Sequence, residues 1–232
     1  MLQRMTAAPI HLRDERFMLD PAGAAFWPAR RILIAADLQF ERPIPGAPRP
    51  PAPHDNKATL ERLNRLVRLY RPAKVIILGG NLPDRDATSL LAKDERARIE
   101  VMAREASFIW VSDKPEATAG LPGVCVSLYR EGAFTFRHAA GPQLGPREFE
   151  ISGYFQPKAS IDARAKRVSR PCFVTGANRL MLPAFGTHGG GLDVRDHTIS
   201  RFFPRGLRVF LLGQDQLFSF ALEQLGRMAE VA

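Results

Sequence analysis

The sequence has little cysteine and no long apolar run, and both absences narrow the class of protein. Its 232 residues include two cysteines, Cys125 and Cys172, which stand in apolar surroundings without the spacing of metal ligands. We therefore expect buried free thiols, not a disulfide or a zinc site. No run approaches the roughly 20 apolar residues of a membrane helix, and residues 1–10 lack the apolar stretch of a signal peptide. These absences predict a cytoplasmic protein with no membrane partner.

Acidic side chains are also in the minority. The chain has 24 acidic and 33 basic residues, which gives a net charge of +9 and an isoelectric point of about 10.2. Such a balance favours a polyanionic partner, nucleic acid before others. The excess is mostly arginine in a chain that is also rich in alanine, proline and glycine, a pattern that genome composition alone can produce. Charge by itself leaves both interpretations open.

The length and the absence of a linker between residues 17 and 221 indicate a single domain, 1–232, with loosely ordered ends at about 1–10 and 222–232. Residues 41–53 contain repeated proline, which excludes a helix or an inner strand. We expect this stretch to be a stiff loop over the ends of the strands; a proline motif for a protein partner is the alternative.

Three apolar runs organise the chain: residues 31–39, 74–81 and 107–114. Apolar and polar positions do not alternate in them, so each is expected to be a buried strand with both faces covered. The first run places Asp37 at its carboxyl end, where open α/β sheets bind ligands. Asp37 is therefore the first candidate site residue, and the ends of the other two runs should lie beside it.

Two amphipathic stretches, residues 58–70 and 89–104, are expected to be the helices that connect these strands, which implies a parallel core with right-handed crossovers. In the first helix Arg62, Arg65, Arg68 and Arg71 recur every three residues opposite the apolar side. This spacing could serve phosphates, but we favour an ordinary solvated face.

The remaining segments are expected to be short strands. A hairpin over residues 17–27 opens the chain, and further strands are expected at residues 124–129, 133–138, 148–153, 167–174 and 208–220. These strands predict a second sheet, mixed or antiparallel, that packs on the first. The predicted fold class is α/β: a sandwich of two mixed β-sheets flanked by helices.

Several local motifs then identify a resemblance. They are Phe26-Trp27-Pro28-Ala29, Phe136-Arg137-His138, Arg170-Pro171-Cys172-Phe173, and Leu182-Pro183-Ala184-Phe185-Gly186 followed by Gly189-Gly190. With these pieces in order, the chain resembles the calcineurin-like metallophosphoesterases, and among them the bacterial DNA-ligase-associated members linked to DNA damage. The resemblance implies a two-sheet sandwich and a phosphoesterase activity that depends on two divalent ions.

The metal-ligand motifs of that family are mostly replaced in this chain. Members carry Asp-x-His, Gly-Asp, Gly-Asn-His, a later His and Gly-His-x-His. Asp37 and His138 match this pattern. The other positions hold Gln39 for the first histidine, Gly80 followed by Asn81 for the bridging aspartate, Asp113 and Lys114 for Asn-His, and Tyr154 and Gln156 for the last two histidines.

Glycine has no side chain, so the replacement at Gly80 removes the carboxylate that would hold both ions. We expect no metal pair and no cofactor; the alternative is a single divalent ion such as manganese or zinc on Asp113 and His138, with Asp37 as an isolated remnant. Lys114 could supply positive charge near Asp37 or Asp113 in place of metal. His188, in a glycine-rich loop, is a further candidate for the same cleft.

Three functions follow from these observations. The leading hypothesis is a catalytically degenerate phosphoesterase-fold protein that retains the cleft and has a nucleic-acid-binding or regulatory role. The second is an active phosphodiesterase or nuclease with an atypical mononuclear site. The third is a scaffold for another protein; the resemblance makes DNA-repair proteins the partners to consider.

Overall fold

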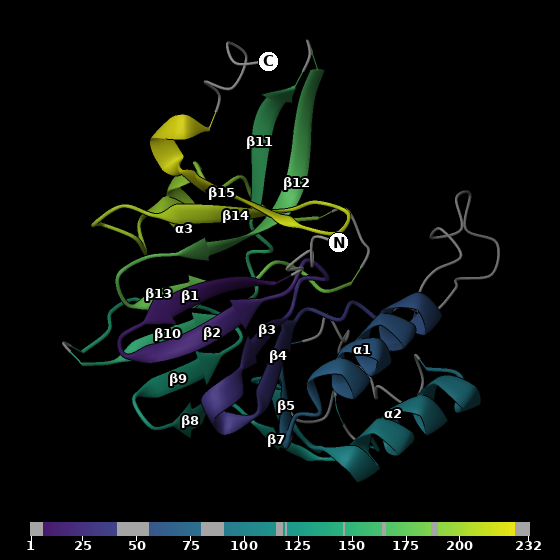
Figure 1. The fold of residues 1–232 in the computed structure, drawn as a ribbon. Coiled ribbons are helices and arrows are strands. Elements are labelled where there is room, and N and C mark those ends of the chain that lie inside the picture. Colours follow the sequence, from purple (N-terminus) through teal and green to yellow (C-terminus); the bar gives the residue numbers. More distant parts are fainter. Residues whose placement is uncertain are drawn as a thin grey trace, which may run out of the picture.

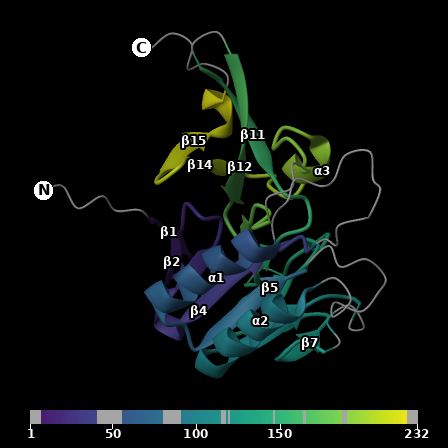
Figure 2. The same cartoon turned by 90° about the vertical axis from the view of Figure 1, so that its right-hand side faces the viewer.

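The computed structural model describes residues 7–40, 56–79, 91–114, 118, 120–145, 147–163, 166–186 and 190–225. Within them two β-sheets face each other, and helices cover the outer side of the first (Figures 1 and 2). The α/β sandwich of two mixed sheets predicted from the sequence is therefore present.

In the described residues, the strands of the first sheet follow one another in chain order. Its strands are β1 (Ala8–Leu12), β2 (Glu15–Leu19), β3 (Ala25–Trp27), β4 (Ile32–Ala36), β5 (Lys74–Leu78), β6 (Ser107–Val111) and β7 (Val124–Val126). Those from β1 to β4 pair antiparallel, and those from β4 to β7 pair in parallel. The hairpin of β2 and β3 was predicted, whereas β1 was not. Strand β4 lies in the middle of this order and is buried along its whole length, as expected.

The second sheet is mixed, with the order β15-β14-β12-β13-β10-β9-β8, and β11 pairs with β12 alone. Its strands are β8 (Tyr129–Glu131), β9 (Phe134–Arg137), β10 (Phe149–Ser152), β11 (Lys158–Ala163), β12 (Lys166–Thr175), β13 (Arg179–Met181), β14 (Arg208–Leu212) and β15 (Leu217–Ala221). Strands β11 and β12 form a two-stranded ribbon that extends away from the rest of the sheet (Figure 1).

One strand assignment from the sequence is wrong. Residues 124–129 were predicted as one strand of the second sheet, but β7 pairs in parallel with β6, and β8 starts the second sheet at Tyr129. A strand of three residues carries too little pattern to specify its partner. The open edge of β6 decides the pairing.

Two long helices connect the parallel strands: α1 (Asn56–Tyr70) precedes β5, and α2 (Lys93–Glu105) precedes β6. They lie together along the outer face of the first sheet (Figure 2), where Arg98 of α2 pairs with Glu61 of α1. A short helix, α3 (His197–Ser200), and 3-10 turns at Pro28–Arg30 and Leu222–Gln224 complete the described elements. No helix in the described residues is long and apolar enough to span a membrane.

Side-chain alternation explains why the three apolar runs have no polar face. Leu33, Val75 and Phe108 point to the helices, where Leu60 and Leu63 of α1 and Met102 of α2 cover them. The neighbouring positions Ile34, Ile76 and Ile109 point to the second sheet. Successive strand residues face opposite sides, so a sheet covered on both sides needs apolar residues at every position.

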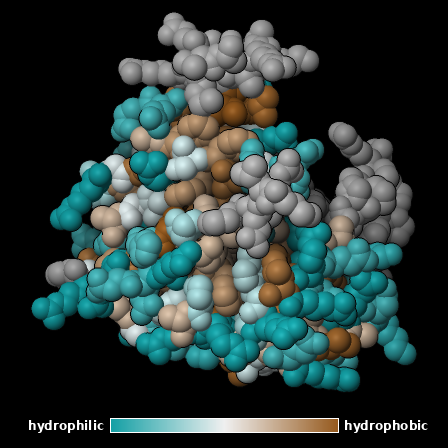
Figure 3. All heavy atoms as spheres, viewed as in Figure 1, coloured by the Kyte–Doolittle hydropathy of each residue, from teal (hydrophilic) through white to brown (hydrophobic). Residues whose placement is uncertain are grey.

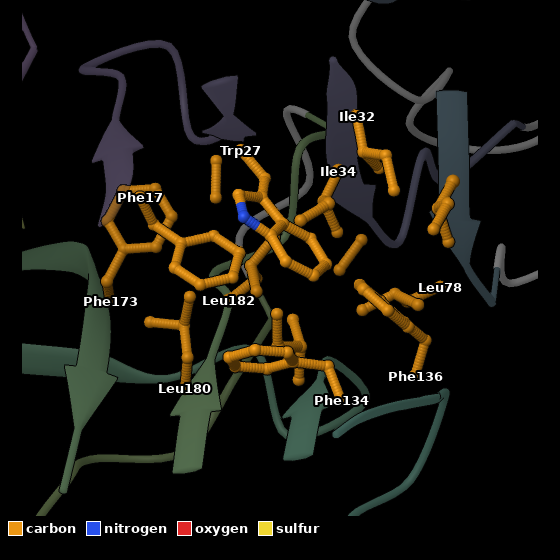
Figure 4. Close-up of a cluster of buried hydrophobic side chains, with 14 of the residues drawn as sticks. Phe17, Trp27, Ile32, Ile34, Leu78, Phe134, Phe136, Phe173, Leu180 and Leu182 are labelled. Carbon is orange, nitrogen blue, oxygen red and sulfur yellow. The ribbon is translucent and has the colours of Figure 1, made fainter. Parts of the chain in front are cut away.

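The core between the sheets is aromatic. Phe17 and Trp27 of the first sheet meet Phe134 of the second, with ring centroids 5.0 Å apart for Phe17–Trp27 and 4.9 Å for Trp27–Phe134 (Figure 4). Leu180 and Leu182 pack in the same cluster. Full burial of such side chains stabilises a fold by about 1.5–3 kcal/mol each, so this cluster is a main source of cohesion between the sheets.

A polar contact ties the sheets together where β5 begins. The Lys74 ammonium donates to the Tyr129 hydroxyl at 2.9 Å and to a Glu131 carboxylate oxygen at 2.7 Å. The hydrogen bond to Glu131 is the main reason that the pKa of Lys74 is raised, and the same bond lowers the pKa of Glu131. The candidate site lies at the opposite end of these strands, where β4 and β5 end.

Several sequence predictions lie at or beyond the limits of the described residues. The proline-rich stretch 41–53, Gly80, Asn81 and His188 fall outside them. Of the ends expected to be loosely ordered, residues 8–10 belong to β1 and residues 222–224 to a 3-10 turn. Hydrophilic residues dominate the surface where Figure 1 draws α1 and α2, in line with the solvated helix face predicted there (Figure 3).

Truncation of Phe134 should separate core packing from surface effects. We expect Phe134→Ala to lower the free energy of unfolding by about 3–5 kcal/mol, because the cavity lies where rings from both sheets meet. Phe218→Ala, on a side chain that is 44% exposed, is the matched control and should change it by less than about 0.5 kcal/mol. Urea unfolding measures both; equal losses would contradict the central role of the cluster.

Candidate functional site

The site is built around Asp37, the residue that follows β4. Its side chain is 0% exposed, and both carboxylate oxygens are engaged. Oδ1 lies 2.9 Å from His138 Nε2, and Oδ2 accepts the backbone N–H of Tyr154 at 3.0 Å. His138 follows β9 and Tyr154 follows β10, so both partners come from the second sheet. The structure thus brings together three of the predicted residues.

A second pair lies beside the first. Gln39 Nε2 donates to Gln156 Oε1 at 3.1 Å, and both side chains are buried. The predicted Leu182–Gly186 motif positions Gln39, because the N–H groups of Phe185 and Gly186 donate to the carbonyls of Ala36 and Asp37. A Cβ on Gly186 would lie 2.6 Å from Gln39 Cβ, so this close approach requires glycine. Five of the ten candidate residues therefore form one contiguous site.

The imidazole of His138 fills the space next to Gly79, where β5 ends. A Cβ on Gly79 would overlap the imidazole ring, and Gly79 has a φ of +66°. The sequence pointed to Gly80, and this role of its neighbour Gly79 was not predicted. Its only sequence signal is a Gly-Gly pair directly after a buried strand.

The backbone is unusual at four of these residues. Asp37, Gln39, Tyr154 and Gln156 have φ values of +49°, +55°, +65° and +49°. Non-glycine residues seldom adopt this region, and each instance costs on the order of 1–3 kcal/mol unless its surroundings impose it. Such strain concentrates at functional sites. Its presence at both halves of the site supports a functional origin for the arrangement.

The structure places a residue other than Lys114 beside Asp37. Within the described residues, the side chain that contacts the Asp37 carboxylate is His138. The other half of the prediction, Lys114 near Asp113, stays a prediction. Strand β5 separates β4 from β6, so Lys114 begins about 10 Å away in sheet spacing, and its side chain is exposed. His138 instead reaches Asp37 from the facing sheet. Asp113, beside Lys114, is also exposed.

A dinuclear metal centre does not fit the described residues. No group of three or more His, Cys, Asp or Glu side chains comes together among them. Asp37 and His138 are engaged with each other, and the adjoining pair consists of neutral amides, which are weak ligands for divalent ions. Gly80, outside the described residues, has no side chain to offer. A single ion on Asp113 and His138 stays a prediction.

A basic cavity of about 720 Å³ opens next to the amide pair. One wall is α1, with Arg62 and Arg65, and the other is the base of the β11–β12 ribbon, with Lys158 and Arg170. Gln156 lies in the lining, which connects the cavity to the buried pairs. From the sequence, the α1 arginines could serve phosphates or form a solvated face; the structure places Arg62 and Arg65 in this lining, together with Arg170 of the ribbon.

The cavity also contains features that the sequence analysis did not identify. Lys158 contributes a further cation, while Asp20 and Asp215 contribute carboxylates. The Asp20 carboxylate accepts hydrogen bonds from the Tyr70 hydroxyl at 2.6 Å and the Ala22 N–H at 2.8 Å. Four basic and two acidic side chains among the described lining leave it net positive. Arg62 is not simply solvated, because its guanidinium lies 4.4 Å from the centroid of the Phe185 ring.

The two-sheet architecture has a counterpart among solved structures. The crystal structure of the Pseudomonas putida nuclease MPE has the same fold: it aligns with a TM-score of 0.65 and 23% identity, over 92% of this chain and all of that chain. A scan against protein-family models and a search of curated proteins gave no match.

The contact between Gly79 and His138 predicts a coupled pair of substitutions. Gly79→Ala should destabilise the protein by roughly 1–3 kcal/mol from the positive φ alone, and by more because the methyl group meets the imidazole. His138→Ala removes the ring, so the double variant should be more stable than the sum of the single losses predicts. Urea unfolding of the four proteins completes the cycle. Additive losses would show that the two side chains do not compete for this space.

Proposed function

We propose that this protein binds nucleic acid in the basic cavity and that it does so without a dinuclear metal centre. The observation that carries the proposal is the continuity of the cavity with the site: Arg62, Arg65 and Arg170 share one lining with Gln156, and Gln156 contacts Gln39 at the end of β4. The fold of a nuclease supports a phosphodiester ligand, and the net charge of +9 supports a polyanion.

The arrangement of cations fits a phosphate backbone better than it fits one small anion. The guanidinium groups in the lining come from two separate elements, α1 and the β11–β12 ribbon. Arginine binds phosphate oxygens through paired N–H groups, so residues on both walls can contact successive phosphates of one strand. We further propose that the resemblance to ligase-associated phosphoesterases reflects a role beside DNA-repair proteins.

The buried pairs explain why binding is proposed in place of hydrolysis. Asp37, the strongest metal ligand retained at the first motif, already contacts His138 and the Tyr154 N–H, and the neighbouring amides of Gln39 and Gln156 bond to each other. A divalent ion at this place would compete with these contacts. The amide oxygens of Gln39 and Gln156 that it would find beside Asp37 are neutral and therefore weak ligands. The competing function is an active phosphodiesterase with a single divalent ion on Asp113 and His138.

Nucleic-acid binding should depend steeply on salt. Neutralisation of three or four phosphates releases counterions, so log Kobs against log salt should have a slope of about −2 to −4. Arg65→Glu and Arg170→Glu should each weaken binding about tenfold at low salt and reduce the slope by about 1. Fluorescence polarisation with labelled DNA and RNA measures both quantities.

Arg68→Glu is the matched control for Arg65→Glu. Arg68 is exposed on the same helix but lines a separate pocket with Arg71 and Glu105. The control should leave affinity within about twofold of the unmodified protein. Binding that no salt concentration changes, or equal losses at positions 65 and 68, would contradict the proposed cavity.

Metal analysis tests the second half of the proposal. The purified protein should contain no stoichiometric pair of manganese, iron or zinc ions, and it should not hydrolyse a generic phosphodiester when manganese is added. Mass-spectrometric metal analysis and a diesterase assay check this. Two bound ions with turnover would overturn the proposal. A single ion that is lost in both Asp113→Ala and His138→Ala would establish the mononuclear alternative.

A further inference from the structure

Tyr154 is a bulky aromatic residue that the site holds in a strained and exposed position. Its φ is +65°, a conformation that is rare for such a residue, and it is 54% exposed. The hydrogen bond from its N–H to the buried Asp37 carboxylate holds the backbone there. Gly153 permits the bend, since a Cβ at that position would lie 2.6 Å from Ala36 Cβ.

The environment of the ring leaves it available for stacking. His138 and Phe155 are its aromatic neighbours in the described residues, at centroid distances of 5.2 and 5.1 Å. Their planes make angles of 81° and 86° with the Tyr154 ring, so each meets it edge to face and neither lies parallel on it. These contacts fix the orientation of the ring while half of the residue stays open to solvent.

The position of Tyr154 relates it to the basic cavity. Gln156, two residues later, lines the cavity that holds Arg62, Arg65 and Arg170. Two residues of chain span at most about 7 Å, so the backbone of Tyr154 lies close to the cavity proposed for phosphates. An exposed aromatic ring beside a positively charged groove is the combination by which proteins hold single-stranded nucleic acid.

We infer that the site takes single-stranded nucleic acid, or an unpaired nucleotide within a duplex, and that Tyr154 is the platform on which one base stacks. This inference rests on the proposed function and adds the class of strand. In an intact duplex each base is stacked between its neighbours and cannot reach a side chain of this kind. Phosphates on the arginines would hold either form, whereas the ring discriminates between them.

The test compares oligonucleotide forms and ring variants. Fluorescence polarisation would measure binding of a labelled 12-nucleotide oligothymidylate, the same length of abasic strand, and a blunt duplex. We expect the oligothymidylate to bind more tightly than the other two. Tyr154→Ala should weaken its binding about tenfold and leave the abasic strand unaffected, while Tyr154→Phe, which keeps the ring, should bind as the unmodified protein does.

Circular dichroism of each variant confirms that the fold is retained. Because alanine keeps a Cβ at the strained position, Tyr154→Ala does not also relax the backbone. If Tyr154→Ala binds oligothymidylate normally while Arg65→Glu does not, the stacking inference is overturned and the proposed cavity stands. If the duplex binds as tightly as the single strand, the inference is likewise overturned. Absence of binding to all three nucleic acids would refute the proposed function itself.

Discussion

The buried carboxylate of Asp37 is the interaction on which the site depends. A carboxylate removed from water must be hydrogen-bonded or paired, or its burial costs several kcal/mol. Its two partners come from two different strand ends of the second sheet, so satisfying this one group fixes how that sheet meets the end of β4. The aromatic cluster supplies cohesion between the sheets, but it is non-directional. The carboxylate supplies the register that aligns Gln39 with Gln156.

The arrangement bears on the motifs that carry the resemblance to the metallophosphoesterases. Where that resemblance implies Asp-x-His and Gly-His-x-His, this chain has Asp37 with Gln39 and Tyr154 with Gln156. These side chains contact one another: imidazole with carboxylate, and amide with amide. Asp37, Gln39, Tyr154 and Gln156 also share a positive φ, a strain that concentrates at functional sites.

The positions of the basic side chains say more about a polyanionic partner than the net charge does. From composition alone, +9 was equally compatible with nucleic-acid binding and with a genome rich in arginine codons. The structure places Arg62, Arg65 and Arg170 around one cavity and leaves Arg68 on a separate surface. A polyanion responds to this local concentration of charge, because screening limits each charge to about 10 Å at moderate salt.

The sequence by itself determined the buried strands β4, β5 and β6, the helices α1 and α2 and the two-layer class, because apolar periodicity is a local signal: these strands lack a polar face since both sides are covered. It did not determine β1 or the separate pairing of β7 and β8. It also identified Asp37, His138, Gln39, Tyr154 and Gln156 as members of one site. Only the tertiary structure decided their pairing. Asp37 and His138 are 101 residues apart and Gln39 and Gln156 are 117 apart, so no local pattern encodes which atoms meet. For the same reason, Lys114 could be proposed from the sequence as the partner of Asp37. In the structure β5 separates β4 from β6, and the imidazole of His138 contacts Asp37 from the facing sheet.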